Sequence, residues 1–427
     1  MKKTEDIGEF LSREKQNILD DLQKLIAFRS YSEDRQCCKS ALDFVLERAE
    51  SFGLKTRLGR YGDVGIVELG EGSPVLGILV HVDVVGEGTL ELWNSDPFQL
   101  TIKEEVLYGR GVVDDKGPVI TCLYAMKYLK EKQVTLNKKV QLIIGTCEEI
   151  KWEDMEHFRE EFPYPDYGFT PDGLFPIYNR ENGYIDLRMV FDEETLQDDE
   201  NIKGGSAVNS IPSSASYRKE EQLVTFTGKA AHSSGPHLGV NAINLLCKDS
   251  GLADTKFAKV INGYFPEGKY ESAVGFPKSD GTVSVEGDLT IVPTLIWQEG
   301  KQVTVNFNVR HSYLIDGKDI VRTIQQYEEE WGFSLHVHEQ LDAINVDENL
   351  PWLARMKWMT EFYGMDSQCK LGPGCSYAKS MPNFVSWGPV FPGDPTCAHM
   401  ENERQPVSSF FKSAEIYALY LEKEVSS

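Results

Sequence analysis

The chain has 427 residues, 41% hydrophobic and 26% charged, so it is long enough for about two to three domains with real cores. This composition excludes an intrinsically disordered, collagen-like or coiled-coil protein. Asp and Glu number 67 against 44 Lys and Arg, and the resulting net charge of −23 repels nucleic acid and anionic membrane surfaces. We therefore expect neither nucleic acid nor membrane as a partner.

Targeting signals and cysteine usage indicate the compartment. The N-terminus carries acidic residues where a secretory signal needs an apolar segment, and no stretch approaches the ~18 apolar residues of a membrane span. The 8 cysteines are scattered without a C-x-x-C pair, which favours reduced, packed thiols over a zinc ribbon or a disulfide scaffold. We therefore expect a cytoplasmic protein.

The first part of the chain alternates helical periodicity with short, branched apolar runs. In chain order these predict helices over 5–29 and 40–52, strands over 64–69 and 75–80, a helix over 118–132 and a strand over 140–145. Strand, helix and strand at this spacing predict a mostly parallel sheet with helices on both faces.

The middle of the chain has a different pattern. From about residue 186, alternating strands occur with two helices, near 238–249 and 317–331, which is typical of an α+β domain. After residue 348 an apolar helical pattern returns and ends in a helix that begins at Pro406. The sequence thus predicts an α/β fold in which a catalytic domain, 1–185 and 349–427, is interrupted by a lid domain, 186–348.

Polar residues follow the predicted strands of the catalytic domain where each strand ends. His81 and Asp83 share one face, so Asp83 can hydrogen-bond one imidazole nitrogen and leave the other for a metal. Asp114 and Asp115 occupy a glycine-rich turn where a phosphate would otherwise bind, so the turn suits a metal better than an anion. Taken singly, each pattern also fits an ordinary structural role, namely a buried histidine held for packing or a helix cap.

Three further segments belong with these. Glu148 and Glu149 follow the strand at 140–145, at the end of the strand where open α/β sheets bind ligands. One could bind a metal and the other transfer a proton, although an ordinary solvated pair of glutamates is the alternative. Asp172 lies in a Pro-Asp-Gly turn, and His399 lies in a Gly- and Pro-rich loop before the last helix. Their convergence on one domain favours a common metal site over independent turns and caps.

The expected ligands are two imidazoles and three carboxylates: His81, Asp114, Glu149, Asp172 and His399. They are too few for two closed sites, but they suffice for two divalent ions if one carboxylate bridges. Two ions, three carboxylates and a bridging hydroxide sum to zero charge, and the ions would make that hydroxide available near neutral pH. Glu148 could take the proton and pass it to a leaving amine, which is amide hydrolysis. Oxygen and nitrogen donors favour zinc, with manganese or cobalt as alternatives.

These segments together resemble the metallopeptidases of the M20 family, most closely its PepV-like dipeptidase branch. The resemblance rests on HVDVV, WNSDPF, LYGRGVVDDKGP, GTCEE, TPDG and AHMENE, and it covers nearly the whole chain. It implies Glu148 as general base, Asp83 as the residue that orients a ligand, and a cis peptide between Asp114 and Asp115. It also implies one metal on His81, Asp114 and Asp172, and the other on Asp114, Glu149 and His399, with Asp114 as the bridge.

The resemblance assigns substrate-binding residues in the lid domain. It implies that His232, in a G-x-x-A-H segment, binds the oxyanion of the tetrahedral intermediate and that Arg310 binds the substrate's terminal carboxylate. Asn209 lies in a segment that resembles the family's lid asparagine, and Gly374 lies in one that resembles its glycine-rich substrate loop. Departures such as Cys147 surround the site and leave side-chain preference open.

The function expected from these residues is a two-metal dipeptidase or aminopeptidase that cleaves dipeptides or short peptides with a free N-terminus. A metal-bridging hydroxide would be the nucleophile, and a small peptide would be the substrate partner. An N-acyl amino acid deacylase of the same fold and a non-catalytic metal-binding relative stay open as alternatives. The large lid resembles enzymes in which one chain supplies every substrate-binding residue, so we expect a monomer.

Overall fold

The computed structural model describes residues 2–197, 200–268, 274–284, 288–372 and 374–426. The chain divides into two compact units. Unit 1 comprises Met1–Arg180, Val346–Gly372 and Ser376–Ser427, and unit 2 comprises Glu181–Asn345 and Pro373–Cys375. Both ends of the sequence therefore contribute to unit 1, whereas the middle of the sequence forms unit 2.

Unit 1 is built on a mixed sheet with the strand order β1-β2-β6-β3-β7-β20-β8, and β19 also pairs with β8. The central strands β6, β3, β7 and β20 are parallel, whereas β1, β2 and β8 are antiparallel to their neighbours. The strands are β1 (Lys55–Leu58), β2 (Gly65–Leu69), β3 (Val75–His81), β6 (Lys139–Gly145), β7 (Tyr167–Thr170), β8 (Ile177–Glu181), β19 (Cys369–Gly372) and β20 (Phe384–Ser386). The predicted α/β class is confirmed, but the sheet is parallel only at its centre. Short connections such as the one between β1 and β2 join antiparallel neighbours.

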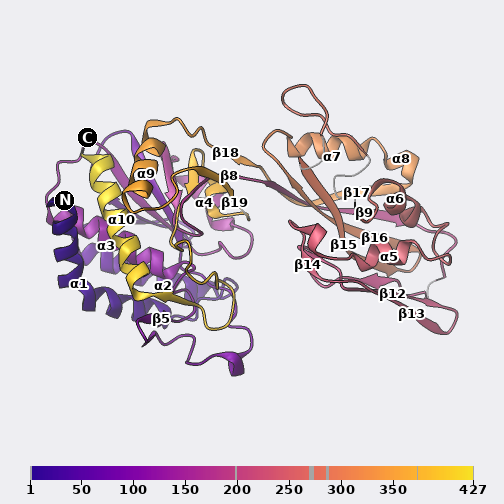
Figure 1. Cartoon of the computed structure of the whole chain (residues 1–427), viewed down its shortest axis with the longest axis horizontal. Coiled ribbons are helices and arrows are strands. Elements are labelled where there is room, and N and C mark those ends of the chain that lie inside the picture. The colour runs from indigo at the N-terminus through magenta and orange to yellow at the C-terminus, as the bar shows by residue number, and fades with distance from the viewer. Residues whose placement is uncertain (1, 198–199, 269–273, 285–287, 373, 427) are drawn as a thin grey trace. The chain divides into compact units, whose positions relative to one another are not determined.

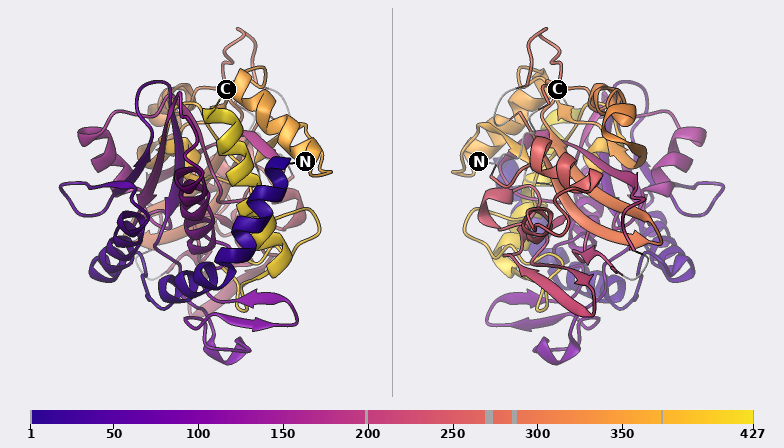
Figure 2. Two further views of the ribbon diagram at one scale, coloured as in Figure 1. Left: turned by 90° about the vertical axis from the view of Figure 1, so that its left-hand side faces the viewer. Right: turned by 90° about the vertical axis from the view of Figure 1, so that its right-hand side faces the viewer.

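The helices of unit 1 pack on this sheet and on one another. They are α1 (Lys2–Ile26), α2 (Arg35–Ser51), α3 (Lys116–Glu131), α4 (Glu153–Glu161), α9 (Pro351–Phe362) and α10 (Val407–Val425), with short 3-10 helices η1 (Leu90–Leu92) and η3 (Tyr377–Ser380). Figures 1 and 2 show α1 and α10, from opposite ends of the sequence, side by side, and both contact α3. The apolar run of β3 is buried from Leu76 to His81, as expected of a central strand covered on both faces. None of the described helices is both long and apolar enough to cross a membrane.

A second, small sheet of unit 1 joins distant segments. Strand β21 (Arg404–Pro406) pairs antiparallel with β5 (Val106–Tyr108), which in turn pairs with β4 (Thr101–Lys103). The backbone N–H of Gly109 also donates to the Glu403 carbonyl oxygen over 3.1 Å. The turn before α3 and the loop before α10 are therefore held side by side.

Unit 2 is an α+β unit around an antiparallel sheet with the order β13-β12-β10-β15-β16-β9-β17, beside a separate β11-β14 pair. Its strands are β9 (Gly183–Asp192), β10 (Lys203–Gly204), β11 (Ser210–Ile211), β12 (Ser214–Lys219), β13 (Gln222–Thr227), β14 (Ala231–His232), β15 (Leu289–Glu299), β16 (Gln302–His311), β17 (Phe333–Leu341) and β18 (Ile344–Asn345). Its helices are η2 (Pro236–Leu238), α5 (Ala242–Cys247), α6 (Lys256–Tyr264), α7 (Gly317–Gln325) and α8 (Glu328–Trp331). Apolar residues of β9 and β16 alternate into one core with these helices, among them Leu187, Phe307 and Val309.

Candidate metal centre

The structure brings the five expected ligands of unit 1 into one cluster. Donor atoms of His81, Asp114 and Asp172 all lie within 4.8 Å of one another, and so do those of Asp114, Glu149 and His399. The two groups share Asp114. Each residue lies at a strand end or in a loop beside one: His81 ends β3, Glu149 follows β6, Asp172 follows β7, Asp114 precedes α3 and His399 precedes β21.

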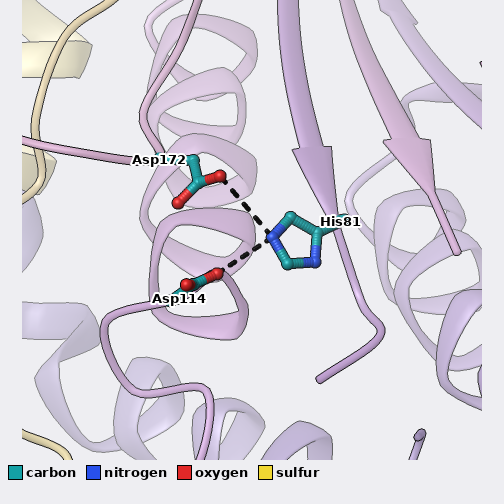
Figure 3. A group of neighbouring side chains, drawn as sticks. All are labelled: His81, Asp114 and Asp172. Carbon is teal, nitrogen blue, oxygen red and sulfur yellow. Dashed lines mark ion pairs between the residues drawn. The ribbon is translucent and has the colours of Figure 1, made fainter. Parts of the chain in front are cut away.

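The first group surrounds a buried imidazole (Figure 3). His81 Nε2 lies 3.0 Å from Asp114 Oδ1 and 3.8 Å from Asp172 Oδ2. His81 is fully buried, yet among the described residues neither its Nε2 nor Asp114 Oδ1 has a hydrogen-bond partner of good geometry. Buried polar atoms without such partners are costly unless a ligand satisfies them, and an imidazole nitrogen with carboxylate oxygens suits a divalent cation. The residues present therefore fit a metal ion.

The second group uses the other oxygen of the same aspartate. His399 Nε2 lies 3.0 Å from Asp114 Oδ2 and 2.9 Å from Glu149 Oε2. The two carboxylate oxygens of Asp114 thus face two different histidines. This is the arrangement that a carboxylate needs in order to bridge two ions. The Asp114–Asp115 peptide bond is cis, as the family resemblance implies.

The electrostatics of the cluster favour bound positive charge. Hydrogen bonds to Asp114 and Glu149 raise the pKa of His399 to about 11. Burial by itself would lower the pKa of His81, but its contacts with Asp114 and Asp83 raise it well above the usual value. Burial, and then the charge of Asp114, raise the pKa of Asp172 to about 8. Protons or metal cations can compensate this concentration of carboxylates.

Asp83 connects His81 to the loop that carries the glutamate pair. His81 Nδ1 lies 3.2 Å from Asp83 Oδ1 and 3.1 Å from the Asp83 carbonyl oxygen, so Nδ1 carries the proton and Nε2 is left for a metal. The carboxylate also accepts the Ser32 hydroxyl over 2.7 Å and the backbone N–H groups of Glu148 and Glu149 over 3.2 Å each. Burial would raise the pKa of Asp83, but these hydrogen bonds hold it below the usual value.

The loop after β6 is fixed by residues that the sequence did not reveal as functional. Asp154 Oδ2 accepts the backbone N–H of Thr146 over 2.6 Å and also accepts the Tyr377 hydroxyl. A Cβ at Gly145 would collide with that hydroxyl and with the Asp154 carboxylate, so the end of β6 requires a glycine. The Trp152 indole N–H donates to the Glu148 carbonyl oxygen over 2.7 Å. The backbone of Glu148 is therefore held at its N–H by Asp83 and at its carbonyl oxygen by Trp152.

Glu403 is a second residue that the sequence did not single out, apart from its place in the AHMENE segment. It is fully buried. Its Oε2 accepts the Arg110 guanidinium over 2.8 Å and Gly111 N–H over 2.9 Å, and its Oε1 accepts the N–H groups of Val113 over 2.8 Å and Asp114 over 3.2 Å. One carboxylate thus holds the whole turn that ends at Asp114.

The expected substrate-binding residues lie in unit 2. His232 belongs to β14, and its Nδ1 lies 3.2 Å from the Ser234 backbone nitrogen and 2.6 Å from the Ser234 hydroxyl. Because a backbone N–H can only donate, Nδ1 must accept, and the neutral ring carries its proton on Nε2. Burial, and then the positive charge of Arg310, lower the pKa of His232, so the ring is neutral at pH 7. Nε2 is therefore a hydrogen-bond donor.

Arg310 lies in β16, directly opposite Tyr184 of β9, and its guanidinium sits 4.5 Å from the centre of that ring. Its Nη1 lies 3.3 Å from Cys375 Sγ. Asn209 is exposed, and its carbonyl oxygen accepts the Ser233 N–H over 2.9 Å. Gly374 is exposed with open space where a Cβ would be, so no close approach requires a glycine there; Pro373 of the same loop lies outside the described residues.

Comparison with known sequences identifies the family. The sequence profile described as peptidase family M20/M25/M40 matches residues 77–423. The chain belongs to this family, which confirms the predicted resemblance; it is a metallopeptidase, and the family implies divalent metal ions.

Individual relatives align with this chain over nearly the whole length of both sequences. The chain is 28% identical over 456 residues to the protein named "Putative dipeptidase YtjP" of Bacillus subtilis, covering 95% of this chain and 96% of that one. It is likewise 28% identical to "Putative dipeptidase SH1171" of Staphylococcus haemolyticus, over 94% of this chain and 95% of the relative.

Solved structures share the fold at low identity. The aminoacylhistidine dipeptidase of Vibrio alginolyticus matches with a TM-score of 0.65 at 14% identity, over 96% of each chain. The dipeptidase Dug1p of Saccharomyces cerevisiae matches with a TM-score of 0.63 at 15% identity, over 99% of each chain. At these identities the likeness supports the fold alone.

Proposed function

We propose that this peptidase is a dipeptidase that uses two divalent ions to hydrolyse dipeptides and short peptides with a free N-terminus. One observation carries the proposal: Asp114 Oδ1 lies 3.0 Å from His81 Nε2, while Asp114 Oδ2 lies 3.0 Å from His399 Nε2. A carboxylate that faces two imidazoles in this way suits a pair of ions. Two relatives that align over nearly their whole length carry the name "Putative dipeptidase", which supports the substrate class.

The proposed ligands are His81, Asp114 and Asp172 for one ion, and Asp114, Glu149 and His399 for the other. When bound, such ions polarise the scissile carbonyl group and make a water molecule more acidic. The ligand set contains imidazole and carboxylate donors and no thiolate, which suits zinc, with manganese or cobalt as alternatives.

Glu148 is the proposed general base. It would take a proton from the attacking water and return it to the leaving amine, so that the peptide C–N bond breaks and two amino acids result. Burial, and then the charge of Asp172, raise the pKa of the Glu148 carboxyl well above its usual value, which makes its carboxylate a stronger base. Asp83 would hold a proton on His81 Nδ1, which raises the basicity of Nε2 and directs its lone pair to the ion.

The proposed substrate contacts come from unit 2. His232 would donate its Nε2–H to the oxyanion of the tetrahedral intermediate, and Arg310 would bind the substrate's terminal carboxylate through paired hydrogen bonds. Asn209 and Gly374 are proposed to contact the substrate backbone. We further propose that the enzyme acts as a cytoplasmic monomer.

The test compares the wild type with the Glu148→Gln variant on Ala-Ala and acetyl-Ala, together with metal analysis of each protein. We expect two equivalents of metal, hydrolysis of Ala-Ala in preference to acetyl-Ala, and a loss of about 10²–10⁴-fold in kcat for the variant at unchanged metal content. Glu153→Gln is the control, because Glu153 of α4 pairs with Arg35 of α2 and takes no part in the cluster.

Each contrary outcome has a defined meaning. A preference for acetyl-Ala would favour the deacylase alternative. A protein that binds two ions and hydrolyses neither compound would be a non-catalytic relative. An active Glu148→Gln variant would remove Glu148 from the role of base, and a protein that binds no metal would end the proposal.

A further inference from the structure

One face of β16 carries polar side chains in the middle of a sheet. Apolar residues at odd positions, such as Phe307 and Val309, enter the core of unit 2, whereas Asn306, Asn308 and Arg310 alternate along the opposite face. Both asparagines have no exposed surface. A fully buried carboxamide is costly unless its oxygen and nitrogen both find partners, so the partners of Asn308 indicate its role.

Asn308 has one partner at each end of its carboxamide. Its Oδ1 accepts the Nε–H of Arg310 over 3.3 Å, and its Nδ2 donates to the Val208 carbonyl oxygen over 3.0 Å. The guanidinium can only donate and the carbonyl can only accept, so the amide cannot be turned over. Asn308 therefore joins Arg310 to the backbone next to Asn209, and the orientation of its amide group is fixed by these two partners.

The guanidinium of Arg310 is held on three sides. Asn308 engages Nε, the Tyr184 ring covers one face at 4.5 Å, and Cys375 Sγ lies 3.3 Å from Nη1. Among the described residues nothing hydrogen-bonds Nη2. A long side chain that is already immobilised loses little entropy when a carboxylate binds to it.

The hydrogen bond from Asn308 to Val208 reaches the β11-β14 pair, where two other proposed substrate residues, Asn209 and His232, lie. Val208 precedes Asn209, whose carbonyl oxygen accepts the Ser233 N–H over 2.9 Å, and Ser210 of β11 pairs with His232 of β14. Asn308 thus links β16 to the β11-β14 pair by a hydrogen bond to the residue before Asn209.

We infer that Asn308 is a positioning residue. Its buried carboxamide orients Arg310 for the substrate's carboxylate and connects Arg310 to the β11-β14 pair, where Asn209 and His232 lie. The inference rests on the proposed function. It predicts that loss of the carboxamide impairs recognition of the substrate carboxylate while the hydrolytic step survives.

The experiment measures kcat and KM of the full-length, metal-loaded enzyme for Ala-Ala and for Ala-Ala-amide, which lacks the carboxylate. Asn308→Leu has nearly the same size but makes neither hydrogen bond. We expect KM for Ala-Ala to rise about 10- to 100-fold with a smaller change in kcat, and the preference for Ala-Ala over its amide to fall by a similar factor.

Asn306→Leu is the matched control. Asn306 lies on the same strand and face and is equally buried, but its partners are Thr294 Oγ1 and Arg188 Nε, each at 3.1 Å. This variant should lose stability without losing the preference for the free carboxylate. Asn308→Asp is the second test variant, in case the leucine does not fold. It keeps the size and the acceptor for Arg310, but it cannot donate to Val208 and it neutralises the guanidinium, so the preference should fall again.

Arg310→Ala separates failure of the inference from failure of the proposed function. If Arg310→Ala abolishes the preference and a folded Asn308 variant keeps it, the inference about Asn308 is wrong while the proposed carboxylate site stands. If Asn306→Leu lowers the preference as much as Asn308→Leu does, the effect is general to the strand and the inference is again wrong. If Arg310→Ala leaves the preference unchanged, both the carboxylate site and the inference are wrong.

Discussion

Replacing Glu403 by glutamine tests whether one buried carboxylate holds the proposed bridging residue in place. Each Glu403 oxygen accepts two donors, and glutamine turns one of these oxygens into an NH₂ group that cannot accept. Two buried donors lose their acceptor at about 1–3 kcal/mol each, and Arg110, which is 1% exposed, loses its counter-charge. We therefore expect the free energy of unfolding to fall by about 3–5 kcal/mol.

The assay combines urea unfolding with metal titration. Because the loosened turn carries Asp114, metal affinity should fall about 10- to 100-fold along with stability. Glu401→Gln is the control: Glu401 belongs to the same loop and accepts the Thr89 N–H over 3.1 Å, but it is not buried, so its substitution should cost at most about 1 kcal/mol. A Glu403→Gln variant with wild-type stability and wild-type metal affinity would refute this account of the turn.

Two further predictions concern metal binding and pH. Because an ion held by the folded cluster does not bind the unfolded chain equally, zinc or manganese at about 100 times its Kd should stabilise the protein by about 2.7 kcal/mol; thermal unfolding would detect this, and an unchanged Tm would contradict the proposed centre. Burial would raise the pKa of Glu14, but hydrogen bonds from Lys127, Asn17 and Arg13 lower it from 4.5 to about 2. A lowered folded-state pKa stabilises above the unfolded value, so Glu14→Gln should cost about 1–2 kcal/mol at pH 7, and this difference should shrink as pH falls from 4.5 towards 2. A difference that is constant with pH in urea unfolding would contradict the ion-pair origin.

The elements that carry the cluster were predictable because local sequence determines them. The apolar run predicted at 75–80 is β3 (Val75–His81), and the one predicted at 140–145 is β6 (Lys139–Gly145). The carboxyl ends of neighbouring parallel strands lie on the same side of the sheet, so His81 at the end of β3 and Glu149 in the loop after β6 could be expected near each other from sequence alone. Their role as metal ligands stays a prediction.

The residues that support the cluster were not predictable, because their partners are distant in sequence. The bond from Glu403 to Arg110 spans 293 residues, and no local periodicity marks either end. Asp154 follows Trp152, which has a left-handed backbone with φ of 53°, and the short helix α4 is mostly charged. In the sequence, Asn308 is an ordinary polar position of a strand. Its hydrogen bond to the Val208 carbonyl oxygen, 100 residues away, can be seen only in the folded chain.

The pairing of β21 with β5 has a consequence for biosynthesis. Residues 404–406 complete the small sheet that begins at residue 101, and His399 lies just before them. A ribosome-bound chain that has not yet exposed this segment contains His81 and Asp114 but lacks the other imidazole and the carboxylate that anchors the turn. We therefore expect the metal ions to bind only after translation of this segment, once β21 has paired with β5 and α10 has packed against α1 and α3.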